Sequence, residues 1–181
     1  NSKGGVGGSK IKALEIDHEY KVPSAVESYE RHKKEGAVLI GIYGTPQTLA
    51  LTQRLTEDKI AGTSPGFGAA AAANGDRYPY IFPIAATYWS QAAGAVQFAK
   101  DKLGGSLKGK KIAHVYHDSP YGKEPIPLLV ERSKMHGFEL MQMPVTHPGV
   151  EQKAAWLQIR QQRPDYVLLW GWGVMNGTAL K

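Results

Sequence analysis

An apolar segment that leads directly into a helix constrains the fold of this chain more than any other feature. Residues 37–43 read Ala-Val-Leu-Ile-Gly-Ile-Tyr, and the run stops at Gly44, Thr45 and Pro46, where a helical pattern begins and continues to Asp58. The run is typical of a buried strand, while Thr45 suits a helix cap and Pro46 the first helical position. The free N–H groups of that first turn should therefore point outward at a sheet edge and favour an anion.

The order of strand, small or polar turn and helix recurs along the whole chain, which predicts an α/β fold with parallel sheets. The expected strands are 10–17, 37–43, 60–63, 111–117, 138–145 and 165–170. The expected helices are 24–34, 46–58, 90–103, 124–135 and 150–162, with Ser90 as the cap of the third, a short helix and turn at 69–74 and the opening of a further helix at 175–181. Because parallel strands end at one edge of a sheet, the turns should enclose a crevice for a small molecule.

Residues 78–88 separate the two series of elements. They are aromatic and extended, and Pro79 and Pro83 interrupt them, as expected of a strand that leaves one sheet for another. We therefore expect two lobes, at residues 1–84 and 85–181, with a hinge crossing near 78–88.

Composition and charge exclude several functional classes. The chain has 181 residues and no cysteine, which rules out disulfides, cysteine nucleophiles and thiolate zinc sites. Its formal charge is +6, but the lysines and arginines are scattered over separate helix ends and turns, so we expect no binding of nucleic acid. No stretch approaches the roughly 18 apolar residues of a membrane span, so we expect no direct insertion into a membrane.

Motifs for catalysis are missing at the places where they would be expected. The glycine-rich residues 4–8 follow no strand and lack the Gly-Lys-Ser/Thr ending of a phosphate loop. On a strand, His114 and His117 would point to opposite faces, which prevents them from holding one metal ion. Ser119 lies beside His117 without the glycine elbow of a hydrolase. We therefore expect no enzyme, no catalytic residue, no metal and no cofactor.

Three further turns carry candidate binding residues. The turn at 64–68 leaves backbone N–H groups free beside small side chains, and the turn after strand 111–117 presents Tyr121. Trp170 and Trp172 follow the last strand on the same side, so that one could stack on a ligand while the other supports it. Packing in the core is the alternative role for Tyr121 and both tryptophans. The candidate ligand-binding residues are Thr45, Gly66, Phe67, Gly68, Tyr121, Trp170 and Trp172.

A family resemblance emerges from six short segments in their order and spacing: Gly4-Gly5-Val6, Tyr29-Glu30-Arg31, Gly44-Thr45-Pro46, Ser64-Pro65, His117 to Gly122 and Pro164 to Val167. Together they resemble the substrate-binding proteins of branched-chain amino acid ABC transporters, which have the type I periplasmic binding fold. The resemblance implies two lobes, each a sandwich of helices on a parallel sheet. It also implies an incomplete fragment, which lacks an opening strand and helix and the later part of both lobes.

The same resemblance implies roles for particular residues. It implies that a ligand carboxylate is held by the hydroxyl of Thr45 and by backbone groups in the turn from Gly66 to Gly68. Tyr121 matches a tyrosine that lines the cleft in that family. Trp172 falls where amino-acid binders carry an aromatic residue, and Trp170 is an added indole nearby. The acidic partner of a ligand ammonium would lie beyond Lys181.

The implied function is that of an extracellular solute-binding protein of an ABC uptake transporter. Such a protein is periplasmic or extracellular, with a lipid anchor at the membrane surface as an option, and delivers its ligand to a membrane permease. The ligand would be a branched-chain or aromatic amino acid or an aromatic acid, and the two indoles favour a bulky aromatic carboxylate over leucine. The alternative is a ligand-sensing domain of a regulator or receptor with the same fold, and an enzyme with a doubly wound sheet ranks third.

Overall fold

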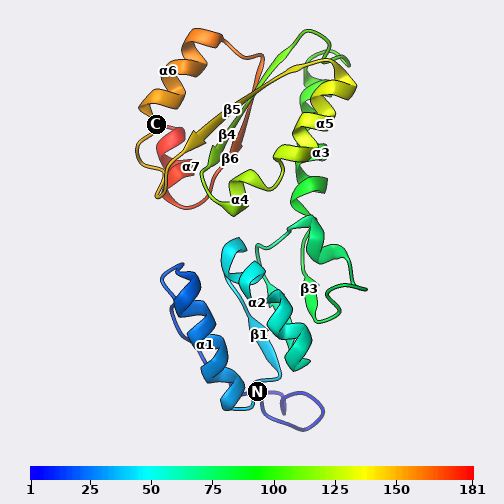
Figure 1. Ribbon diagram of the computed structural model, residues 1–181, viewed down its shortest axis with the longest axis vertical. Coiled ribbons are helices and arrows are strands. Elements are labelled where there is room, and N and C mark those ends of the chain that lie inside the picture. Colours follow the sequence, from blue (N-terminus) through cyan, green and yellow to red (C-terminus); the bar gives the residue numbers. More distant parts are fainter.

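Two parallel sheets, each with helices on its faces, form the two lobes of the computed structural model, which describes residues 1–181 (Figure 1). The first lobe has strand order β1-β2-β3, and the second has order β5-β4-β6. The first lobe contains α1 (Val22–Lys34), β1 (Leu39–Gly41), α2 (Thr45–Asp58), β2 (Ala61–Ser64), the 3-10 helix η1 (Ala70–Ala73) and β3 (Ile81–Pro83). The second contains α3 (Tyr88–Lys102), β4 (Lys111–His117), α4 (Pro120–Lys123), α5 (Ile126–His136), β5 (Glu139–Val145), α6 (Lys153–Gln162), β6 (Tyr166–Trp170) and α7 (Val174–Ala179). This architecture confirms the predicted fold class. No helix is both long and apolar enough to cross a membrane.

The predicted strand at 10–17 is wrong, because these residues are extended but belong to no sheet. A strand exists only where a neighbouring strand accepts its hydrogen bonds. From Lys12 to Asp17 the backbone makes no hydrogen bond to other backbone groups. Nor does the apolar pattern of this segment correspond to burial, because Leu14 is only half-buried and Ile16 is 38% exposed.

The helix caps also differ from expectation. Gly44, with φ at 100°, is the N-cap of α2, and Thr45 is already its first helical residue. The Thr45 hydroxyl is thus free of capping and contacts the other lobe instead. In α3 the cap is Thr87 rather than Ser90, since the Thr87 hydroxyl accepts the Ser90 N–H at 3.1 Å.

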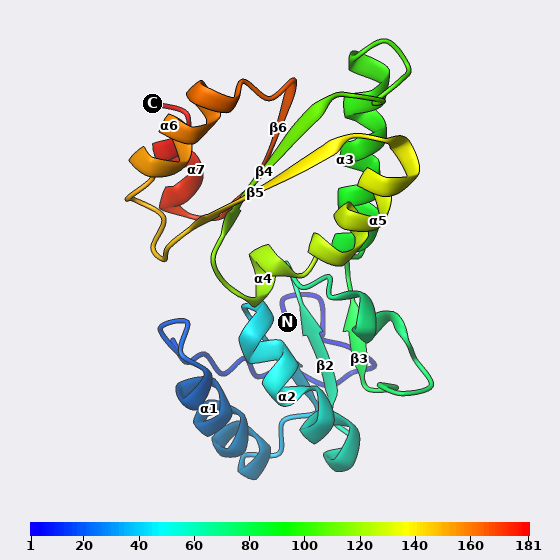
Figure 2. The same ribbon diagram turned by 45° about the horizontal axis from the view of Figure 1, so that its top comes forward.

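The helix predicted at 124–135 is confirmed as α5, and prolines split it from a short preceding helix, α4, that was not predicted. Pro120 starts the short α4, and Pro125 and Pro127 frame the start of α5, where the missing N–H groups cannot continue an α-helical ladder. This split brings α4 over the carboxyl end of β4, facing α2 of the first lobe (Figure 2). The remaining elements of the second lobe agree with the prediction within a few residues at their ends.

Each lobe has its own apolar core, and one buried seam joins the two. In the first lobe Leu55 and Tyr29 are fully buried between helices and sheet, while in the second lobe Ile112 and Leu129 have the same role. Trp170 packs against both cores. Because this indole belongs to β6 of the second lobe, it fixes how that lobe rests on the first.

Candidate ligand site between the lobes

A cavity of about 200 Å³ lies where the two lobes meet. Its lining residues are aromatic, hydroxyl-bearing or glycine, and none of them carries a charge. The first lobe contributes Tyr20, Tyr43, Gly44, Thr45 and Gly66, and the second lobe contributes Tyr88, Tyr121 and Trp172. A cavity of this size suits a ligand of about one ring with a small polar group.

Parallel topology explains why residues far apart in the sequence meet here. Tyr43 and Thr45 follow β1, and Gly66 follows β2, so all three lie at the carboxyl end of the first sheet. Tyr121 follows β4 and Trp172 follows β6 in the second sheet. Carboxyl ends of parallel strands are the usual place for ligand sites in α/β folds, and here the ends of two sheets face each other.

A chain of buried hydroxyl groups crosses the cavity wall from one lobe to the other. The Tyr88 hydroxyl donates to the carbonyl oxygen of Gly66 at 2.7 Å, which leaves it to accept from Thr45 Oγ1 at 2.8 Å. Thr45 and Tyr88 are each only 2% exposed. The Thr45 hydroxyl proton is therefore engaged by the opposite lobe, while its lone pairs stay available.

Aromatic rings cover the remaining walls. Tyr20 of the first lobe stacks obliquely on Trp172 of the second, with ring centroids 4.7 Å apart. Trp172 in turn lies against His147, at 6.0 Å between centroids. On the far wall Tyr121 meets the edge of Tyr88 at 5.2 Å. These contacts make the Trp172 indole a bridge between the lobes.

Burial moves the pKa of three of the phenol groups in the cavity further above the neutral range. It raises the pKa of Tyr121 to about 12, with smaller contributions from the neighbouring tyrosines. It also raises the pKa of Tyr88 and of Tyr20. At neutral pH these hydroxyls are consequently hydrogen-bond donors and acceptors without charge, so an anionic ligand would meet no phenolate repulsion.

The structure brings four of the seven candidate residues to this cavity. Thr45, Gly66, Tyr121 and Trp172 line it. Phe67 is instead buried in the first-lobe core. Gly68 and Trp170 also lie outside the lining of the cavity. Gly68 is packed against the start of α3, where a Cβ on it would stand 2.8 Å from the Ala86 carbonyl oxygen. Trp170 packs behind Tyr121, with ring centroids 6.0 Å apart.

Three lining residues were missed by sequence reasoning. Tyr43 ends the apolar run of β1 and Tyr88 ends the aromatic segment, so position alone could have suggested both. Tyr20 gives no such signal. It lies in a turn with φ at 57°, and its ring contacts Tyr43 of its own lobe and Trp172 of the second lobe.

The histidine-serine pair at the end of β4 is closer than its sequence spacing suggests. His117 Nδ1 lies 2.8 Å from Ser119 Oγ, and His117 Nε2 lies 3.0 Å from His147 Nδ1. Asp118 pairs with Lys123 at 2.6 Å rather than with His117. Burial, followed by the proximity of His147, lowers the pKa of His117. The carboxylate of a catalytic triad is thus directed elsewhere, and no cluster of three metal-ligating side chains occurs in the structure.

Two α/β lobes that place the carboxyl ends of their strands around one uncharged cavity define a two-lobe solute-binding fold. The chain belongs to the periplasmic binding protein family, whose model matches residues 1–181. This result confirms the family resemblance drawn from the six segments. The family is one of non-catalytic binding proteins, as expected for this chain. No curated protein sequence matches the chain.

Solved structures support the same assignment. One described as an ABC transporter permease from the Pseudomonas fluorescens group is 41% identical, with a TM-score of 0.80 over 98% of this chain and 44% of its own. A branched-chain amino acid ABC transporter protein from Thermus thermophilus with bound valine is 20% identical, with a TM-score of 0.87 over 99% of this chain and 46% of its own. A solute-binding protein from R. palustris in complex with benzoate is 24% identical, with a TM-score of 0.81 over 99% and 48%. The last two show likeness of fold. The chain spans less than half the length of these structures.

Proposed function

We propose that the chain belongs to a solute-binding protein of an ABC uptake transporter, and that the cavity between its lobes holds a small aromatic carboxylate. The observation that carries this proposal is the lining of the cavity, which combines stacked aromatic rings with neutral hydroxyl groups and one helix N-terminus. The protein would act in the periplasm or outside the cell and deliver its ligand to a membrane permease.

The carboxylate end of the ligand is best placed beside the start of α2. The first-turn N–H groups of a helix have no acceptor within the helix, and the macrodipole favours a negative charge there. Gly44 at the cap has no side chain to fill this position, and Thr45 contributes the nearest hydroxyl. When Thr45 donates its proton to a carboxylate, it gives up its bond to Tyr88, so ligand binding would rearrange a contact between the lobes.

The ring end of the ligand is best placed among the aromatic side chains. Trp172, Tyr20 and Tyr121 line the same cavity, and favourable ring pairs contribute about 0.5–1.5 kcal/mol each beyond the burial of their area. The acidic partner that the family resemblance implies for a ligand ammonium would lie beyond Lys181, so the lining of this cavity does not bear on it. The three aromatic rings favour a ligand that carries a ring of its own, which is an aromatic acid or an aromatic amino acid.

The structural relatives include a protein bound to an aromatic acid and a protein bound to an amino acid. The R. palustris protein is bound to benzoate, and the T. thermophilus protein is bound to valine. The aromatic side chains that line this cavity agree better with a ligand such as benzoate. In the mechanism we propose, contacts to both lobes favour a closed state that the transporter recognises, with the segment between β3 and α3 as one crossing of the hinge.

Calorimetric titration with benzoate, phenylacetate, valine and leucine tests this proposal. We expect saturable binding of at least one aromatic acid and weaker or no binding of the aliphatic amino acids. Trp172→Ala should weaken that binding by about tenfold or more, because a lost ring contact and its burial amount to about 1.4 kcal/mol. Trp156→Ala on α6 is the matched control, since Trp156 bonds to Gln152 and does not line the cavity.

Two results would contradict the proposal. Binding of valine or leucine alone would show that the ligand is an amino acid and that its ammonium partner lies outside the residues described above. Equal affinity of Trp172→Ala and the unmodified protein for an aromatic acid would move the site away from this cavity.

A further inference from the structure

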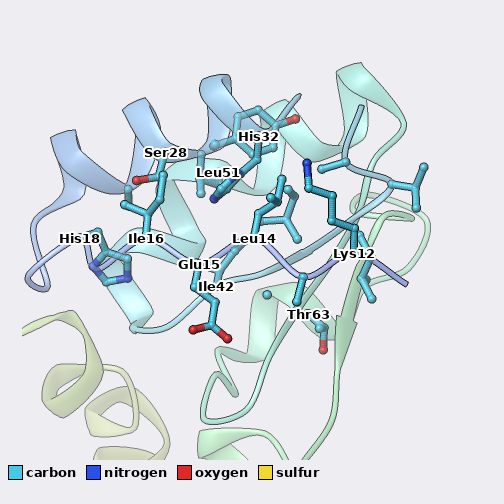
Figure 3. A pocket seen from close by; sticks show the side chains of 18 of the residues that line it. Lys12, Leu14, Glu15, Ile16, His18, Ser28, His32, Ile42, Leu51 and Thr63 are labelled. Carbon is cyan, nitrogen blue, oxygen red and sulfur yellow. The ribbon is translucent and has the colours of Figure 1, made fainter. Parts of the chain in front are cut away.

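A groove of about 550 Å³ between residues 11–16 and the open edge of β1 is a second and larger cavity, confined to the first lobe (Figure 3). Twelve of its 19 lining residues are hydrophobic, so the groove is apolar. The opening strand that the family resemblance implies outside this chain accounts for it. The unexplained feature of this lobe lies instead at the start of α2, beside the cavity between the lobes.

Gln47, in the first turn of α2, is a buried residue whose side-chain amide has no hydrogen-bond partner. Its exposed fraction is 0%, and neither Nε2 nor Oε1 bonds to another group. The large majority of buried side-chain polar atoms in proteins are paired, because a buried polar group without a partner destabilises the fold. Gln47 carries a donor and an acceptor of this kind, which indicates a partner that the chain itself does not supply.

The amide of Gln47 lies against two residues of the ligand cavity. A Cβ added to Gly44 would clash with Gln47 Oε1 and would stand 2.7 Å from Cε2 of Tyr20. Gly44 and Tyr20 line the cavity between the lobes, whereas Gln47 does not. The missing side chain at position 44 therefore leaves room for the amide at the edge of this cavity, where the ring of Tyr20 covers it.

The same place carries the free donors of a helix N-terminus. Pro46 has no N–H group, and the N–H groups of Thr45 and Gln47 donate to no backbone carbonyl oxygen. Burial raises the pKa of Tyr20, and the nearby Thr45 N–H opposes this rise, so the Tyr20 hydroxyl lies close to the position that suits an anion. To these donors the Gln47 amide adds a further donor at Nε2 and an acceptor at Oε1.

Tyr20 can uncover this amide when the lobes separate. Its ring pairs with Trp172 of the second lobe, at 4.7 Å between centroids, and more distantly with Tyr43 of its own lobe, at 6.3 Å. Glu19 and Tyr20 both have positive φ, at 52° and 57°, which is a strained conformation for residues other than glycine. Separation of the lobes thus removes the closer of the two ring contacts that hold Tyr20 over Gln47.

We propose that Gln47 is a specificity-determining residue of the ligand site, and that the ligand is an aromatic carboxylate with a hydroxyl or ammonium group on the carbon next to the carboxylate. This inference rests on the proposed function and narrows it. The carboxylate accepts hydrogen bonds from Gln47 Nε2 and from the first-turn N–H groups of α2, and the neighbouring O–H or N–H group donates to Gln47 Oε1. A plain aromatic acid has no donor for Oε1 and leaves that oxygen buried without a partner.

Three ligands with one carbon skeleton test the proposal. Phenylacetate, mandelate and phenylglycine carry hydrogen, hydroxyl and ammonium, respectively, on the carbon next to the carboxylate. By calorimetric titration we expect mandelate or phenylglycine to bind at least about tenfold more tightly than phenylacetate, because a site built to accept a hydrogen bond rejects a ligand that lacks the donor.

Substitution of Gln47 identifies the residue that causes this preference. Gln47→Met keeps a side chain of similar length but removes the amide, and it should reduce the affinity ratio to less than about threefold. Gln53→Met on the same helix is the matched control, because the Gln53 side chain is exposed and bonds to Glu57 at 2.9 Å. This control should leave the ratio unchanged.

The melting temperature without ligand gives a second readout. Gln47→Met removes two buried polar groups that lack partners, so we expect it to raise Tm by about 2 °C or more. A lower Tm, or failure of this variant to fold, would show that the amide has a structural partner within the chain and would overturn the proposal.

The titrations also separate this proposal from the proposed function. Equal affinities for the three ligands, or a ratio that Gln47→Met leaves unchanged, would overturn the role of Gln47 while an aromatic carboxylate remained the ligand. Binding of benzoate alone would have the same meaning. Failure of every aromatic carboxylate to bind would overturn both proposals.

Discussion

The buried hydroxyl chain between the lobes allows a quantitative test through Tyr88→Phe. This substitution removes one oxygen atom and leaves the ring in place. It deletes the bond to the Gly66 carbonyl and the bond from Thr45, which are 2.7 and 2.8 Å long. The contacts of the Tyr88 ring with Phe67, Tyr121 and Trp170 remain.

The expected loss follows from the surroundings of the two partners. A hydrogen bond contributes about 0.5–1.5 kcal/mol net, and a buried group left without a partner costs about 1–3 kcal/mol. Gly66 is exposed, so its carbonyl oxygen can bind water, whereas Thr45 is 2% exposed and cannot. We therefore expect a decrease of about 1–2 kcal/mol in the free energy of unfolding, or about 2–8 °C in Tm for a chain of this size.

Differential scanning calorimetry measures this shift. Tyr43→Phe is the matched control, because Tyr43 lines the same cavity but is 54% exposed, and its Tm should change little. Thr45→Val should cost a similar amount, and the double variant should cost less than the sum of both, since the two hydroxyls bond to each other. A Tm for Tyr88→Phe within 1 °C of the unmodified chain, or strict additivity with Thr45→Val, would refute the reasoning.

Two further predictions concern the seam and the second lobe. Burial raises the pKa of Glu124, although the Ala70 N–H that bonds to it at 2.8 Å opposes this. The contribution of Glu124 to the free energy of unfolding is therefore greatest below the pKa that this group has in the unfolded chain. It decreases as pH rises through the higher pKa that the group has in the folded chain. Glu124→Gln should remove that loss as pH rises above the ordinary glutamate pKa of 4.5, so Tm curves parallel to those of the unmodified chain would contradict the assignment. Gly122→Ala would place a Cβ 1.8 Å from the His117 carbonyl oxygen and should cost at least about 1–3 kcal/mol by urea denaturation. Gly94→Ala in α3, where a Cβ meets open space, should be neutral or stabilising.

Local patterns were sufficient for most of the secondary structure. The strands at β4, β5 and β6 lie close to their expected residues because each is a short apolar run between turns and helices. The helix expected at 90–103 is present as α3, and its residues Ala92 and Ala99 are fully buried in the second-lobe core. Such signals need no knowledge of the neighbouring elements.

Predictions failed where a residue's state depends on a distant partner. Residues 12–17 have the pattern of a strand but lack a neighbour to pair with. Thr45 has the chemistry of a cap, yet its hydroxyl bonds to Tyr88 of the other lobe. Trp170 and Trp172 could not be assigned separate roles by alternation, because β6 ends at Trp170 and the next residues leave the extended conformation.

The sequence by itself determined the α/β class, the order of elements and the family, since these depend on hydrophobic periodicity and on short motifs. Only the tertiary structure decided which aromatic residues share the cavity between the lobes, and that an open edge of β1 faces an apolar groove. The physical reason is that the fold class, the order of elements and the family depend on patterns within consecutive residues. The lining of the cavity and the open edge of β1 depend on how the two sheets are placed in space, which a local pattern does not determine.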